Sequence, residues 1–132
     1  MYLLDIDTII FALKAVPEVV RNFVSHAADP KALSVVTYGE LVYGAIKSAR
    51  SVENLAKVRR TVDLFPVIEV SRAVMDTFGS LKVDLEKKGK TVDDFDLVIA
   101  STALLLNYKL VTNNEKHFRH IPGLAVENWT KS

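Results

Sequence analysis

The sequence predicts an α/β protein of three layers, in which helices cover both faces of a mostly parallel central sheet. Short apolar segments alternate with segments of helical periodicity along the whole 132-residue chain. Strands separated by helices need right-handed crossover connections, and these produce a parallel sheet that is buried on both faces. Hydrophobic residues make up 49% of the chain and charged residues 25%, which is an ordinary globular composition. We expect one domain that spans residues 1–132.

Five segments are predicted as strands because each is a short run of apolar or β-branched residues. The first run ends at Asp5, and the fourth is followed by two asparagines. In chain order the expected strands are residues 2–4, 32–36, 65–70, 109–112 and 124–129.

The predicted helices are placed by their caps and by apolar residues at helical spacing. One helix starts near Asp7, and a second covers residues 18–28 after Pro17. Thr37 is expected to cap a helix that begins at Tyr38. The remaining helices are expected to begin at Ser51, to run from a Ser71 cap to Lys88 before Gly89, and to cover residues 93–106.

Composition limits the classes of function. The net charge is only +1, from 17 Lys and Arg against 16 Asp and Glu, so the overall charge does not indicate a nucleic-acid partner. Cysteine is absent, which excludes disulfides and thiolate metal sites. No secretory signal is evident, and the most apolar stretch, residues 97–106, is far too short to span a membrane. We therefore expect a soluble cytoplasmic protein without a membrane partner.

The position of a ligand cleft follows from the predicted sheet. In parallel α/β sheets the cleft lies beyond the carboxyl ends of the strands, which directs attention to Asp5, to residues 37–40 and to residues 112–114. Asp5 ends the first strand, where burial of a carboxylate is costly unless a partner compensates its charge. The alternative is that Asp5 only caps the helix that starts near Asp7.

Two further carboxylates are candidates for the same cleft. Asp96 has apolar residues three, four and seven positions further along its predicted helix, so its charge needs a partner such as a cation. A capping box with Asp93 at the N-cap explains Asp96 equally well. Glu40 lies opposite the apolar stripe of its helix, so periodicity alone makes it a solvated residue. Its position one turn into a helix that follows a strand places it near the cleft.

Together, Asp5, Glu40 and Asp96 suggest a metal site. Several carboxylates without His or Cys suit a hard, oxygen-preferring ion, Mg²⁺ or Mn²⁺. Such an ion orients water, lowers the pKa of that water and neutralises charge on a phosphodiester. None of the three histidines has the spacing of zinc ligands, and we assign His117 and His120 to a surface turn or to RNA contacts.

Three segments resemble the PIN-domain family, and most closely its VapC toxins of type II toxin–antitoxin pairs. They are YLLDIDTIIFALK (residues 2–14), SVVTYGELVYGAIKS (residues 34–48) and the stretch from LEKKGK to VENW (residues 85–129). The resemblance implies a PIN-like α/β/α fold and a Mg²⁺- or Mn²⁺-dependent endoribonuclease that hydrolyses RNA by metal-activated water. It also implies a homodimer and a cognate VapB-like antitoxin.

The same resemblance assigns roles to individual residues. Asp5 and Asp96 correspond to acidic residues that hold the ion, and Glu40 to one that completes or orients its shell. The family's fourth acidic position falls on Asn114, which adds no charge, as in the branch that cuts initiator tRNA in the anticodon loop. Thr112 is expected to bond a carboxylate or a water molecule of the shell.

The first motif departs from the family pattern, which usually has Asp-Thr-Asn where this chain has Asp5-Ile6-Asp7. Asp7 is therefore either an extra ligand or a helix cap. The same tripeptide imitates the nucleophile motif of haloacid-dehalogenase-type phosphatases, in which Asp5 would form an aspartyl-phosphate. That motif normally continues with Thr or Val where this chain has Ile9. A second alternative is a PIN-like module that binds RNA or protein without cutting it, which the neutral Asn114 would suit.

Overall fold

Five parallel strands form one sheet in the order β3-β2-β1-β4-β5. The computed structural model describes residues 1–131. Its strands are β1 (Tyr2–Leu4), β2 (Lys31–Ser34), β3 (Val67–Ile68), β4 (Lys109–Val111) and β5 (Val126–Glu127). Each neighbouring pair is parallel, which confirms the predicted fold class. Because β1 lies between β2 and β4, the strand order reverses at β1, and this reversal is where α/β sheets hold ligands.

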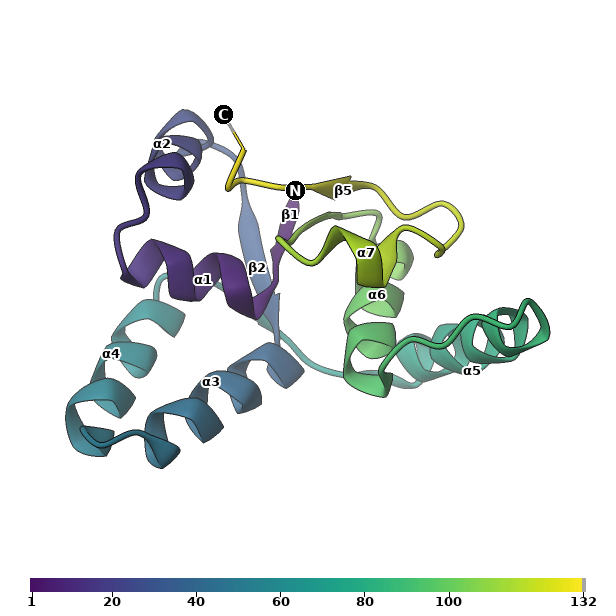
Figure 1. Ribbon diagram of the computed structural model, residues 1–132, viewed down its shortest axis with the longest axis horizontal. Coiled ribbons are helices and arrows are strands. Elements are labelled where there is room, and N and C mark those ends of the chain that lie inside the picture. Colours follow the sequence, from purple (N-terminus) through teal and green to yellow (C-terminus); the bar gives the residue numbers. More distant parts are fainter. Residues whose placement is uncertain (132) are drawn as a thin grey trace.

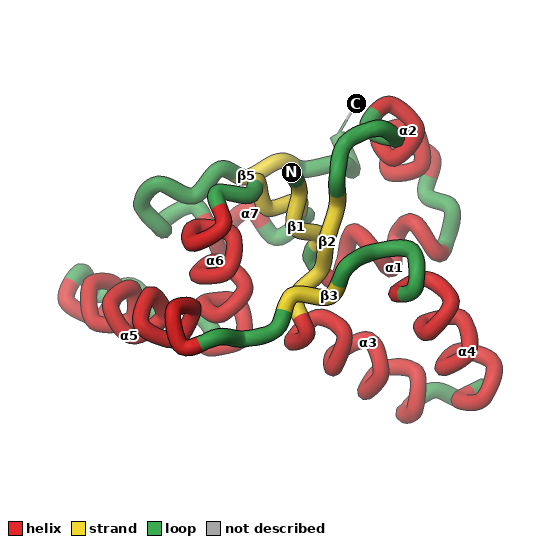
Figure 2. The backbone as a smooth tube through the Cα atoms, turned by 180° about the vertical axis from the view of Figure 1, so that it is seen from behind, coloured by secondary structure: helices red, strands yellow, loops and turns green. Residues whose placement is uncertain are grey.

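Helices cover both faces of this sheet, as predicted. The helices are α1 (Ile6–Leu13), α2 (Pro17–Ser25), α3 (Val35–Lys47), α4 (Ser51–Val62), α5 (Arg72–Lys87), α6 (Asp94–Leu106) and α7 (Glu115–Phe118). Figure 1 shows α1 to α4 on one side of the strands and α5 to α7 on the other, and the reverse view in Figure 2 shows the same division. Within residues 1–131, no helix has the length and apolar character needed to cross a membrane.

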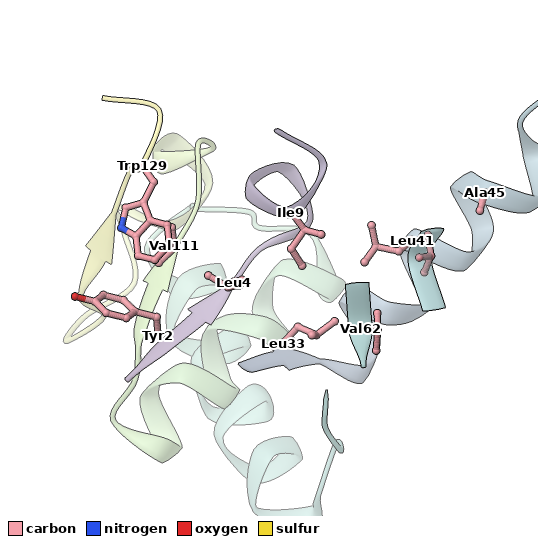
Figure 3. Packing of buried hydrophobic residues seen from close by; sticks show 10 residues of the cluster. Tyr2, Leu4, Ile9, Leu33, Leu41, Ala45, Val62, Val111 and Trp129 are labelled. Carbon is pink, nitrogen blue, oxygen red and sulfur yellow. The ribbon is translucent and has the colours of Figure 1, made fainter. Parts of the chain in front are cut away.

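The strands place alternate residues in two separate cores. Tyr2 and Leu4 belong to the core beneath α1 to α4, which also contains Trp129 and is shown in Figure 3. Leu3 points the opposite way and packs with Leu97 of α6 in the second core. Successive side chains of a strand point to opposite faces, so apolar residues at consecutive positions are the sequence signature of this doubly covered sheet.

Several predicted boundaries were wrong near the carboxyl edge of the sheet. The second strand ends at Ser34, because the Ser34 side chain accepts a hydrogen bond from the Val36 amide (3.1 Å) and so begins α3 three residues before Tyr38. Thr37 is therefore a buried residue inside α3 and not its cap. Strands β3 and β5 are shorter than predicted, at two residues each, and α7 was not predicted as a helix.

Candidate functional site

Asp5 lies at the carboxyl end of the central strand β1 and is 2% exposed. Its Oδ1 accepts a hydrogen bond from the Ile6 amide (2.9 Å), so Asp5 is the N-cap of α1. Its Oδ2 accepts a hydrogen bond from the Thr112 hydroxyl (2.8 Å). The capping role and the buried position, which were alternatives in the sequence, therefore occur together.

Residues that follow β4 hold Asp5 and Asp7 in place. The buried Thr112 hydroxyl, which donates to Asp5, also accepts a hydrogen bond from the Asn114 amide (3.0 Å). Asp7 Oδ2 accepts a hydrogen bond from the Asn113 amide (3.0 Å). These bonds join the start of α1 to the turn after β4 across the point where the strand order reverses.

The charge of Asp5 is strongly disfavoured in this environment. The pKa of Asp5 is raised to about 6, chiefly because the carboxyl is buried and next because Asp7 is nearby. Asp96 raises this pKa too, while the hydrogen bonds from Thr112 and the Ile6 amide lower it. No basic group of the described residues is among these influences. A bound cation would supply the missing positive charge.

Asp96 lies in the first turn of α6 and is partly buried. Its Oδ2 is 3.0 Å from Nδ1 of His117 in α7. Burial raises the pKa of Asp96, and the contact with His117 opposes that rise. Asp93 is the N-cap of α6, as the capping-box alternative required, and its own carboxylate accepts a hydrogen bond from the Phe95 amide (3.2 Å). The partner of Asp96, however, is His117.

Glu40 lies in the second turn of α3 and is half-buried, so periodicity alone, which made it a solvated residue, was a poor guide to its surroundings. Burial raises the pKa of Glu40, and the charges of Asp5 and Asp96 raise it further. The three carboxylates therefore influence one another although they come from three different helix starts. Figure 1 shows why: α1, α3 and α6 all begin at the carboxyl edge of the sheet.

The carboxylates do not yet form a closed ligand shell. Among residues 1–131, no three His, Asp or Glu side chains are close enough together to hold a metal ion as they stand. Mutual repulsion favours this separation, since each charge raises the cost of the next. The donor set nevertheless fits a divalent cation that prefers oxygen. It consists of carboxylates that raise one another's pKa, and no basic group of the described residues offsets the charge of Asp5.

Two other acidic or polar candidates have different positions. Asn114 is exposed at the N-cap of α7, where its side chain makes no capping hydrogen bond. Asp94 forms an ion pair with Lys82 of α5 (2.9 Å) and is 61% exposed. Asp94 thus has a partner of its own outside the carboxylate group.

His117 is the residue that sequence reasoning missed, because it was assigned to a surface turn or to RNA contacts. Its contact with Asp96 joins residues that are 21 positions apart. The helix α7 that presents it is held by Phe118, which is 1% exposed. A buried aromatic one residue after a histidine was the available signal, since it fixes the direction in which the histidine points.

The sequence was also compared with known proteins. Residues 4–124 match the family described as the PIN domain. The chain is 35% identical over 133 residues to "Ribonuclease VapC2" of Rickettsia felis, covering 99% of each chain. It is 33% identical over 128 residues to "tRNA(fMet)-specific endonuclease VapC" of Salmonella typhimurium, covering 97% of each.

Solved structures of VapBC complexes have a similar fold. The fold is similar to that of VapBC2 from Rickettsia felis bound to a DNA fragment from its promoter, with a TM-score of 0.90 at 34% identity over 97% of this chain and 98% of that one. It is also similar to VapBC-1 from nontypeable Haemophilus influenzae, with a TM-score of 0.88 at 30% identity over 98% of each chain.

Proposed function

The chain belongs to the PIN-domain family and to its VapC ribonucleases, and on that premise we propose that it is a divalent-metal-dependent endoribonuclease, the toxin of a VapBC toxin–antitoxin pair. The observation that carries this proposal is the buried Asp5 at the reversal of strand order, with Asp96 and Glu40 acting on it electrostatically. A phosphatase that used Asp5 as a nucleophile is disfavoured, because residues 4–124 match the PIN domain.

Each site residue has a proposed role in metal binding or proton transfer. Asp5 and Asp96 would hold the ion, with Glu40 and Asn114 completing or orienting its shell. When bound, the divalent ion neutralises charge on the phosphodiester and promotes ionisation of the attacking water. Thr112 keeps one oxygen of Asp5 fixed by donating its hydroxyl proton to it. Glu40, whose pKa is raised, is suited to accept a proton from the attacking water.

Both carboxylate oxygens of Asp7 accept hydrogen bonds from the protein. One of its oxygens accepts the Asn113 amide, and the other accepts the hydroxyl of Thr8 (3.2 Å). Asp7 would therefore add negative charge next to Asp5 and, as at Asp5, its oxygens keep lone pairs with which it could join the ion.

The substrate and partners follow from the relatives. We propose tRNA as the RNA substrate, with the anticodon loop of initiator tRNA as the first site to examine, because one relative is named a tRNA(fMet)-specific endonuclease. A VapB-like antitoxin would inhibit the enzyme, and an Arg side chain from such a partner would match the carboxylates in charge and geometry. The same proposal includes a homodimer and a single PIN-like domain over residues 1–132. It also includes a cytoplasmic location, because tRNA is found there.

Cleavage of purified total tRNA tests the proposal. The antitoxin-free protein is incubated with Mg²⁺, with Mn²⁺ or with EDTA, and the new RNA ends are mapped by sequencing. We expect discrete cuts with either Mg²⁺ or Mn²⁺, none with EDTA, and none with Asp5→Ala or Asp96→Ala. Asp94→Ala is the matched control, since Asp94 is next but one to Asp96 and pairs with Lys82 instead. Cuts that persist in EDTA or in both site variants would refute the proposed function.

A further inference from the structure

A largely apolar groove lies beside the carboxylates. It is lined by four residues of α3 and one of α6, and its volume is about 580 Å³. The lining residues are Val36, Gly39, Glu40, Tyr43 and Phe95. Two of these are aromatic residues that remain open to solvent, with Tyr43 65% and Phe95 54% exposed.

The groove is continuous with the candidate metal site at two positions. Glu40 lines the groove and also interacts electrostatically with Asp5 and Asp96. Phe95 directly precedes Asp96 at the start of α6. An RNA whose scissile phosphate lies at the carboxylates would therefore bring a neighbouring nucleotide to Tyr43 and Phe95.

Charge and shape along α3 also suit a nucleotide. The ammonium group of Lys47 lies 5.6 Å from the centre of the Tyr43 ring, so a positive charge stands next to the aromatic surface. A Cβ added at Gly39 would meet no atom within 4 Å, so the groove is open at this point. Aromatic faces that stack bases, together with cations that contact phosphates, are the usual means of holding unpaired RNA.

We propose that Tyr43 and Phe95 form a pocket that stacks one unpaired base next to the scissile phosphate. This inference rests on the proposed ribonuclease function and adds the feature that would select single-stranded RNA. Tyr43 and Phe95 supply the stacking surface, Gly39 leaves room for the base, and Lys47 is placed to contact a phosphate.

The test uses a short single-stranded RNA with one 2-aminopurine base, whose fluorescence is quenched by stacking. All proteins carry Asp5→Asn so that the RNA stays intact. We expect binding to quench the fluorescence, and Tyr43→Ala or Phe95→Ala to remove the quenching and weaken the affinity by roughly tenfold. Tyr43→Phe and Phe95→Tyr should restore both. The same RNA in a duplex should show neither effect.

A pair of glycine variants distinguishes the effect of filling the groove from the effect of adding a large side chain elsewhere on the protein. Gly39→Leu should fill the groove and weaken RNA binding, whereas Gly79→Leu in α5 should not, although both added side chains start in open space. Unchanged quenching and affinity in both alanine variants would overturn the inference. The inference would also be overturned if those variants changed the sedimentation of the protein but not its RNA binding. Such a result would mean that another protein chain covers the groove. Metal-dependent tRNA cleavage by the protein without Asp5→Asn is a separate assay, so the proposed function can stand when this inference fails.

Discussion

Asp5 combines a structural role with a position suited to the proposed chemistry. As the N-cap of α1 it satisfies a backbone amide at the helix start, and as a buried carboxylate it keeps an acceptor oxygen at the reversal of strand order. The cost of this arrangement is a charge that the described residues do not neutralise. A bound cation, as proposed for this site, would offset that cost.

The raised pKa of Asp5 predicts how the stability of the metal-free protein depends on pH. Because the pKa is raised from 3.8 to about 6 in the folded state, the folded protein binds the Asp5 proton more tightly than the unfolded chain does. In EDTA the free energy of unfolding should therefore fall as the pH rises from about 4 to 6, by on the order of 2–3 kcal/mol from this group. Asp5→Asn should remove that part of the slope. Urea denaturation at several pH values measures it, and an unchanged slope in Asp5→Asn would show that other groups cause it.

Thr112 tests the fine positioning of Asp5. Thr112→Val keeps the shape of the side chain but removes the hydroxyl that donates to Asp5 Oδ2. Partners that orient a ligating carboxylate contribute about 10–100-fold to metal affinity or activity. We expect a loss of that size in RNA cleavage for Thr112→Val and near-complete retention for Thr112→Ser. Equal rates for the two variants would mean that the hydrogen bond does not position Asp5.

At the scale of single elements, local chemistry determined most boundaries. The cap at Ser71 was predicted from the sequence, and its side chain does accept a hydrogen bond from the Val74 amide. The start of α3 was misplaced because Ser34 and Thr37 are both good cap residues, and sequence alone does not say which of them ends the strand. Burial of Ser34 and Thr37 was decided by packing between α3 and the sheet.

Helix α3 offers a test of local stability at Gly44. This glycine lies inside the helix, is exposed, and would gain a Cβ that meets no atom within 4 Å. Gly44→Ala should raise the free energy of unfolding by about 0.5–1 kcal/mol, because alanine loses less backbone entropy in a helix. Thermal denaturation measures the change. A lower melting temperature would show that α3 needs the flexibility of glycine at this position.

At the scale of the whole molecule, the sheet brings distant residues to one edge. The alternation of strands and helices was enough to predict parallel strands and the edge at which Asp5 and Thr112 meet. The contact between Asp96 and His117 was not predictable, because it depends on how α7 packs against α6. The half-buried state of Glu40 likewise depends on its neighbours across the cleft and not on the periodicity of α3.

The carboxyl-terminal segment contributes to the core at this scale. Trp129 is 2% exposed and packs edge-on against Tyr2 of β1 and Phe23 of α2, as Figure 3 shows for Tyr2. Trp129→Ala should therefore lower the free energy of unfolding by about 3–5 kcal/mol. Because this is the only tryptophan, unfolding should be followed by circular dichroism. A loss below about 1 kcal/mol would contradict the central position of Trp129.

Metal binding by matched variants tests the central claim most directly. Isothermal titration of Mn²⁺ into the wild type, Asp96→Asn and Asp94→Asn compares two acidic residues in the same helical turn, of which only Asp96 influences Asp5. We predict saturable binding to the wild type, at least tenfold weaker binding to Asp96→Asn, and unchanged binding to Asp94→Asn. Equal affinity for wild type and Asp96→Asn would contradict the assignment of these carboxylates as the metal site.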